Sequence, residues 1–174
     1  MTDTAKQEMT QSERYDKATR VVKKHTFISM GIGLVPLPLV DVAAVTGDQL
    51  LMLGELSKLY QVRFYKNLGK SLIGSLVYGL AANSTTGIVA SIFKIVPYVG
   101  TVLGMTTMSL YSGAATYAIG RVFIKHFESG GTFLDFDPDL IRADFEREFK
   151  DGEKIVAEKH KSEKEKKKET TEKK

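Results

Sequence analysis

The sequence predicts an all-α fold, a helical bundle with a glycine-rich hydrophobic helical hairpin in the middle. Apolar residues recur at helical spacing in several stretches, and no stretch alternates apolar and polar residues as a half-buried strand does. The 174 residues suit one domain. The chain has no Cys, which excludes disulfides, thiolate metal sites and thiol nucleophiles, so packing alone must hold the core.

The first expected element is an amphipathic helix over residues 11–29. Ala18 and Val22 lie on its apolar side, and Arg20 and Lys24 take the opposite side. Glycines and prolines follow directly, and a proline disfavours helical geometry in the residue before it. The helix is therefore expected to end before this segment.

A second helix is expected over residues 42–60, with Asp41 as its N-cap, because an Asp side chain accepts hydrogen bonds from the first backbone amides. Its apolar residues form one face, and Asp48, Glu55 and Lys58 are expected on the wet side. A third helix follows over residues 65–81.

The segment Asn-Ser-Thr-Thr-Gly at residues 83–87 is expected to break or kink the third helix, and residues 94–100 are expected to form a connection. A long helix then covers residues 99–128, and the Gly-Gly pair at 130–131 should end it. The Asp-Pro pair at 137–138 fits the N-cap and first position of a last helix.

Charge divides the chain into three parts. Residues 1–24 and 150–174 hold 27 of the 46 charged side chains, and the net charge of +4 hides this separation. The predicted organisation is a polar N-terminal segment (1–16), a single all-α domain (17–150) and a charged Lys/Glu tail (151–174), which is either helical or disordered.

Two uncharged runs, residues 71–93 and 95–120, flank Lys94. Each exceeds the about 20 residues that a helix needs to cross a bilayer, which indicates a transmembrane hairpin. Basic residues outside the runs then predict cytoplasmic termini. The many Ser, Thr and Gly residues make each run a weak span, however, and they equally suit close packing in a soluble bundle. Both alternatives stay open.

Small and polar residues in these apolar surroundings are the candidate site residues. Gly100 and Gly104 form a GxxxG step with Gly113 further along, which predicts close helix packing. Asp41 and Gln49 are candidates for partner recognition, or simply a helix cap and a half-exposed helix residue.

No arrangement for catalysis is apparent, and we expect no enzyme activity, no cofactor, no metal and no nucleic-acid partner. Gly69-Lys70-Ser71 resembles the end of a phosphate-binding loop, but that motif needs a glycine where Phe64 stands. His25, His126 and His160 lack the spacing of metal ligands.

Several motifs, taken in order, resemble the YcjF-like, GTPase-associated domain-of-unknown-function family (domain of unknown function 697). Its P-x-P-x-x-D … Q … Y-G signature is similar to Val35–Asp41, Gln49 and Leu59-Tyr60. The later matching segments are Phe93–Gly104, Ala115–Gly120 and Phe127–Gly131. The resemblance covers about residues 17–150. Gln61 stands where the family usually has Gly, which argues against a tight helix end there.

The resemblance implies a bacterial helical domain, often fused to or encoded near small GTPases and sometimes part of inner-membrane proteins. Because this sequence contains no GTPase domain, the implied activity is partner binding through Asp41, Gln49 and Tyr60. The leading expectation is a membrane-associated adaptor at the bacterial inner membrane, with lipid and a small GTPase as partners. The alternatives are a cytoplasmic all-α interaction domain, oligomeric through its glycine-rich helices, and a pore-forming or membrane-perturbing hairpin.

Overall fold

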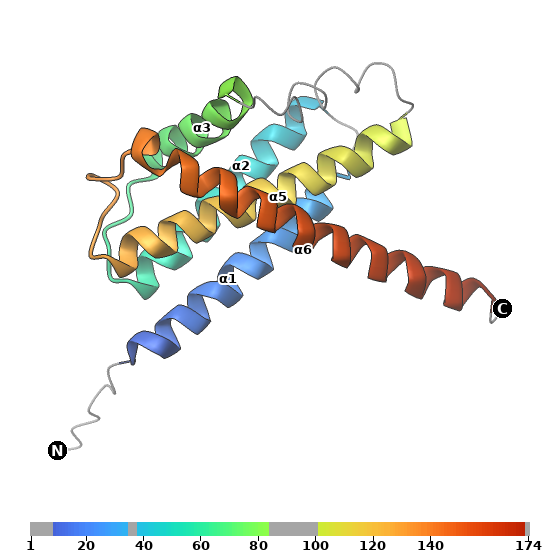
Figure 1. Cartoon of the computed structure of the whole chain (residues 1–174), viewed down its shortest axis with the longest axis horizontal. Coiled ribbons are helices and arrows are strands. Elements are labelled where there is room, and N and C mark those ends of the chain that lie inside the picture. Colours follow the sequence, from blue (N-terminus) through green and yellow to red (C-terminus); the bar gives the residue numbers. More distant parts are fainter. Residues whose placement is uncertain (1–8, 35–37, 84–100, 173–174) are drawn as a thin grey trace.

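The computed structural model describes residues 9–34, 38–83 and 101–172, and these residues form five α-helices and no strand (Figure 1). The helices are α1 (Gln11–Ile32), α2 (Pro38–Leu59), α3 (Lys66–Asn83), α5 (Thr101–Glu128) and α6 (Pro138–Glu172). The predicted all-α class is confirmed for this part of the chain. The predicted connection at 94–100 and most of the predicted break at 83–87 lie outside the described residues.

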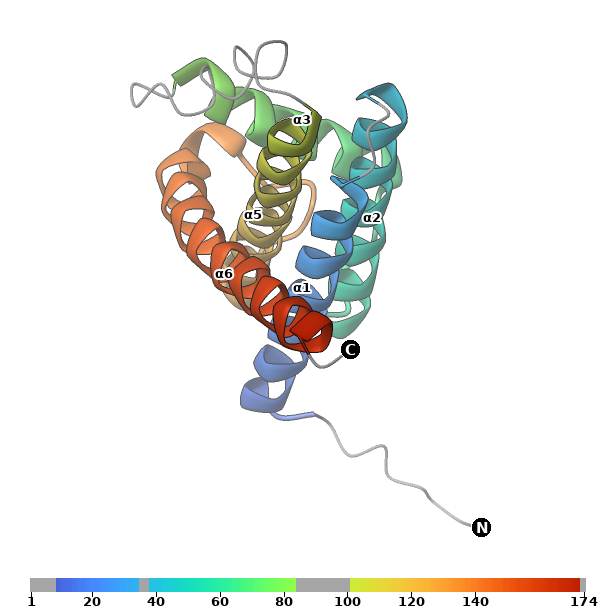
Figure 2. The same ribbon diagram turned by 90° about the vertical axis from the view of Figure 1, so that its right-hand side faces the viewer.

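Helix α5 lies in the middle of the bundle, with α1 and α6 packed along it (Figures 1 and 2). Helix α2 packs against α1, and α3 lies against both α2 and α6. The second half of α6 extends away from the other helices to the C-terminus (Figure 1). The charged tail is therefore helical over its described part.

The uncharged character of the second run follows from this central position. The part of the 95–120 run that lies in α5 is covered by α1 and α6, and its described residues from Tyr111 to Gly120 are almost all buried. The first run, 71–93, begins in α3 and continues past Asn83, so the turn of the predicted hairpin lies outside the described residues. Among the helices that the structure describes, none is both long enough and apolar enough to cross a membrane.

Glycines allow the close approach of the central helices. A Cβ atom added to Gly120 would lie 2.5 Å from Val22 of α1. A Cβ atom on Gly113 would lie 2.8 Å from Val156 of α6 and 3.3 Å from Met30 of α1. The absence of a side chain at these two positions lets α1 and α6 lie directly on α5.

The start of α2 differs from the expectation. Asp41 was expected as the N-cap, but α2 begins at Pro38, so Asp41 lies in the first helical turn and that prediction is wrong. Proline suits the first helical position because its φ angle is already helical and its missing N–H has no intrahelical partner there. The side chain of Asp41 lies outside the described part of the structure.

The end of α2 is tight although the expected glycine is missing. Gln61 adopts the left-handed conformation, with φ at 57°. The Val62 N–H donates to the Ser57 carbonyl at 2.8 Å, and the Gln61 N–H donates to the Lys58 carbonyl at 3.4 Å. This is the double hydrogen bond of a Schellman end, which usually has glycine in the left-handed position.

The connection from α5 to α6 follows the local chemistry of the sequence. Gly130 has a φ of 86°, and the Gly131 N–H donates to the His126 carbonyl at 3.0 Å, which ends α5 as predicted. Asp137 caps α6, since its Oδ1 accepts the Asp139 N–H at 2.9 Å. Below this connection, Phe123 stacks on Phe136 with ring centroids 4.2 Å apart.

We predict that Gln61→Gly stabilises the protein by roughly 0.5–1 kcal/mol, measured by urea unfolding. A left-handed residue with a Cβ atom costs about 1–2 kcal/mol, and the extra unfolded-state entropy of glycine offsets part of the gain. Gln61→Ala keeps the Cβ atom and should bring no such gain. Equal stabilisation by both variants would contradict the strain at this helix end.

We predict that Gly113→Ala lowers the free energy of unfolding by roughly 1–3 kcal/mol, because its methyl group must displace Val156 or Met30. Gly74→Ala is the matched control. It lies on an exposed part of α3 with no atom within 4 Å of the new methyl group. There the change should stabilise the helix by about 0.5–1 kcal/mol. Thermal or urea unfolding of both variants tests whether Gly113→Ala lowers the free energy of unfolding and Gly74→Ala raises it.

Candidate functional site: an apolar groove above a buried polar chain

Five buried side chains form a continuous line of hydrogen bonds across α1, α2 and α5, which we call the buried polar chain. Gln49 Nε2 donates to Thr116 Oγ1 at 3.0 Å, and Thr116 Oγ1 donates to Ser29 Oγ at 2.9 Å. Ser29 Oγ donates in turn to Asp48 Oδ2 at 2.8 Å, and His25 Nδ1 lies 2.7 Å from Asp48 Oδ1. None of the five is more than 6% exposed.

The buried polar chain reaches the surface through Glu55. His25 Nε2 lies 3.3 Å from Glu55 Oε1, and Lys24 Nζ donates to the same carboxylate at 2.7 Å. Burial raises the pKa of Glu55, but the contacts with Lys24 and His25 together outweigh it, so its pKa lies below the ordinary value. Both ring nitrogens of His25 therefore face carboxylate oxygens, one buried and one at the surface.

This arrangement holds two helices in one register. His25 and Ser29 are four residues apart and therefore share one face of α1, where both contact Asp48 of α2. Removing a carboxylate from water costs several kcal/mol unless its oxygens are hydrogen-bonded. Any sliding of α1 along α2 would separate Asp48 from these partners, so the pair of helices behaves as one unit.

The geometry does not match a nucleophilic triad. Ser29 donates to the carboxylate that also contacts His25, whereas a triad needs the imidazole to accept the proton of the serine. Among the side chains that the structure describes, no cluster of His, Asp and Glu has the arrangement of a metal site.

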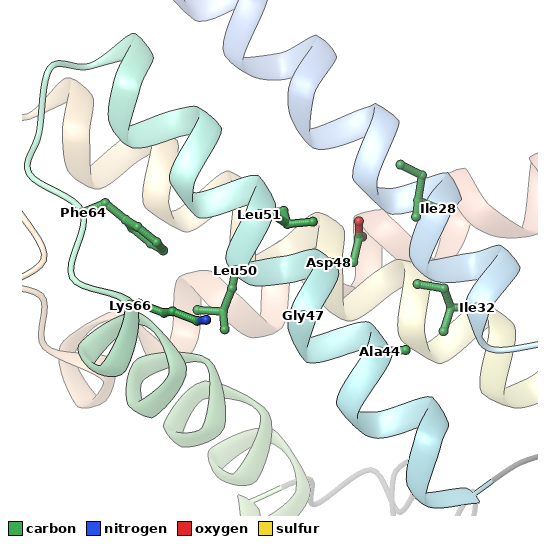
Figure 3. Close-up of a pocket in the computed structure, with 9 residues that line it drawn as sticks. All are labelled: Ile28, Ile32, Ala44, Gly47, Asp48, Leu50, Leu51, Phe64 and Lys66. Atoms are coloured by element: carbon green, nitrogen blue, oxygen red, sulfur yellow. The ribbon is translucent and has the colours of Figure 1, made fainter.

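Directly beside the buried polar chain, α1 and α2 form an open apolar groove (Figure 3). Leu51 of α2 is 66% exposed and Ile28 of α1 is 43% exposed, although both are large apolar side chains. The α1–α2 groove is lined by Ile28, Ile32, Ala44, Gly47, Asp48, Leu50, Leu51, Phe64 and Lys66. Asp48 thus belongs to both features, because its helix turn forms part of the groove and its carboxylate points to α1.

The structure separates the residues that the sequence grouped as partner contacts. Gln49 was expected to be half-exposed, but it is buried in the polar chain, and this correction follows from its hydrogen bond to Thr116. Tyr60 is also buried, and its hydroxyl donates to Glu128 Oε1 at 2.6 Å. Burial, and then the Glu128 carboxylate, raises the pKa of Tyr60. Gln49 and Tyr60 therefore share no open surface with each other.

The predicted packing glycines are described in part. Gly113 lies between α1 and α6, as given above, and Gly104 belongs to the first turns of α5. Gly100 lies outside the described residues.

Sequence reasoning missed most of the buried polar chain. Asp48 was expected on the wet side of α2, and this is wrong because the carboxylate faces α1. A usable signal existed: His25 and Ser29 lie one helical turn apart on α1, and Asp48 and Gln49 adjoin in an otherwise apolar part of α2. The hydrogen bonds that join Thr116 to Gln49 and Ser29 connect three helices and are apparent only in the folded structure.

Comparison with known proteins agrees with the motif resemblance. The family described as "Domain of unknown function (DUF697)" matches residues 2–149. The magnetosome membrane protein 22 of Magnetospirillum gryphiswaldense is 39% identical over 141 residues, which cover 80% of this chain and 72% of that protein. No solved structure matches.

We predict that Thr116→Val lowers the free energy of unfolding by about 2 kcal/mol, because Gln49 Nε2 loses its buried acceptor and Ser29 Oγ loses the hydrogen bond that it accepts. Thr26→Val is the matched control. Thr26 is equally buried, but its hydroxyl donates only to the Val22 carbonyl of its own helix, so its replacement should change stability by less than about 0.5 kcal/mol. Urea unfolding measures both. Equal losses of stability in the two variants would argue against a connected line of hydrogen bonds through Thr116.

Proposed function

The chain belongs to the DUF697 family, and we propose that it is a non-enzymatic, membrane-associated helical binding protein. In this proposal the α1–α2 groove rests on the lipid surface at the cytoplasmic face of the bacterial inner membrane. The bundle then holds a partner protein there as an adaptor.

The observation that carries the membrane contact is the exposure of the groove. The core is complete without Ile28 and Leu51, since the buried cluster is built from other residues. Large apolar side chains gathered on an open surface mark binding sites for protein or membrane more often than chance exposure. Burial of apolar surface contributes about 25 cal/mol per Å², so even partial insertion of these side chains favours binding.

The related magnetosome protein supports the membrane part of the proposal, because its name places it in a membrane. The partner part rests on the family resemblance, which implies a small GTPase on another chain. Together these make an adaptor the function that fits the chain best, with lipid on one side and a protein on another.

The two alternatives have less support from the described structure. A pore-forming hairpin requires α5 to leave α1 and α6, which cover most of its middle. If the protein is an interaction domain without membrane contact, the α1–α2 groove binds the surface of another protein. The experiment below distinguishes the membrane adaptor from this second alternative.

We predict that the double variant Ile28→Asp/Leu51→Asp binds vesicles at least tenfold more weakly than the parent, because charged side chains replace both exposed apolar groups. The assay is co-sedimentation of the full chain with mixed phosphatidylcholine and phosphatidylglycerol vesicles. Leu140→Asp is the matched control, since Leu140 is 83% exposed but lies on α6, away from the groove. This control should bind as the parent does.

Two results would contradict the proposed membrane contact. The first is that the parent chain does not co-sediment with the vesicles. The second is that the groove variant and the Leu140 control lose binding to the same extent. Circular dichroism of each variant confirms that the helices remain, as expected for substitutions at exposed positions.

A further inference from the structure

We propose that the α1–α2 groove recognises an anionic lipid surface, with Lys58 and Lys66 at its rim contacting the headgroups. This inference rests on the proposed function and adds the chemistry of the lipid. It follows from the distribution of charge over the helices, from the pairing of the few acids near the groove and from the spacing of the lysines.

Residues 17–83 carry a larger net positive charge than the chain as a whole. Residues 17–83, which include most of α1 and all of α2 and α3, hold eight Lys and Arg residues and three Asp and Glu residues, a net charge of +5. The whole chain carries +4, so the remaining residues together carry −1. Helix α6, which lies across α5 from α2, has eleven acidic residues and ten basic ones (Figure 2).

Two of the three acids in this part are already paired within the protein. Asp48 is buried against His25 and Ser29. Glu55 is held by Lys24, with Nζ and the carboxylate oxygens 2.7 Å apart. The third acid is Asp41, near the start of α2. Asp48 and Glu55 therefore offer little charge to neutralise the lysines near the groove.

Helical spacing puts basic residues on the same side as the groove. Lys58 lies seven residues, or two turns, after Leu51 on α2. Lys17 precedes Ile28 on α1 by eleven residues, or three turns, which is the same face, and Lys24 on that face is the lysine paired with Glu55. Lys66 lines the groove itself at the start of α3, next to Leu50 (Figure 3).

Lys58 and Lys66 are both exposed and form no ion pair in the described structure. An exposed lysine near an anionic bilayer strengthens binding by about 1 kcal/mol, or roughly fivefold. Apolar side chains inserted between headgroups and lysines that contact the phosphates act together, as they do in amphipathic surface helices. Lys66 lines the groove beside its apolar side chains, and Lys58 lies on the same face of α2 as Leu51.

The positive charge of Lys58 and Lys66 argues against a second copy of the protein as the occupant of the groove. Two copies meeting face to face would bring their unpaired lysines together, and like charges repel across such an interface. A bilayer that carries negative lipids offers the complementary charge and an apolar interior at once.

The experiment compares the full chain on vesicles of phosphatidylcholine alone and of phosphatidylcholine mixed with phosphatidylglycerol. We expect binding to the mixed vesicles to exceed binding to the neutral ones at least tenfold, and to weaken as added salt screens the charges. Lys58→Gln/Lys66→Gln should weaken binding to the mixed vesicles by roughly tenfold or more. Lys161→Gln/Lys164→Gln removes two exposed lysines from the projecting part of α6 and should leave binding nearly unchanged.

Equal binding to neutral and mixed vesicles would overturn the anionic-lipid inference while leaving membrane association intact. The inference is also overturned if Lys58→Gln/Lys66→Gln and Lys161→Gln/Lys164→Gln weaken binding to the mixed vesicles equally. A dimer in vesicle-free solution that Leu51→Asp dissociates would also overturn it, in favour of a second copy. Absence of binding to both kinds of vesicle would instead defeat the proposed function itself.

Discussion

The buried carboxylate of Asp48 is the constraint on which the arrangement of α1 and α2 depends. It is 6% exposed and must keep its contacts with His25 and Ser29 to offset the loss of hydration. Ile28 of α1 and Leu51 of α2 lie beside these contacts in the sequence, and both remain exposed, at 43% and 66%. The contacts of Asp48 hold α1 and α2 together, and the apolar groove lies between the two helices, with Asp48 among its lining residues.

The cost of burying charged side chains also explains why the middle of the chain is uncharged. Helix α5 is surrounded by α1 and α6, so charged side chains along its middle would have to lose their hydration. Small residues such as Gly113 and Gly120 bring the neighbouring helices close enough to exclude water. Charge is displaced to the outer helices, where α1 and α3 carry the positive excess.

Local chemistry made part of this structure predictable. The glycine pair after α5 and the Asp137 cap of α6 act through backbone hydrogen bonds within a few residues, so the sequence alone indicates them. Asp48 could not be placed in the same way, because its burial depends on which face of α2 meets α1. Gln61 shows the converse, since its two backbone hydrogen bonds hold a conformation that its residue type disfavours.

The most direct test of the central claim uses the absence of Trp from the chain, which makes a single introduced Trp a unique fluorescent reporter. Leu51→Trp places it in the groove, and Leu140→Trp places it on α6 at another exposed position. On adding mixed phosphatidylcholine and phosphatidylglycerol vesicles with brominated acyl chains, the account predicts a blue shift and quenching for Trp at position 51 and neither at position 140. A shift at position 140 alone, or at neither position while the protein binds, would contradict it.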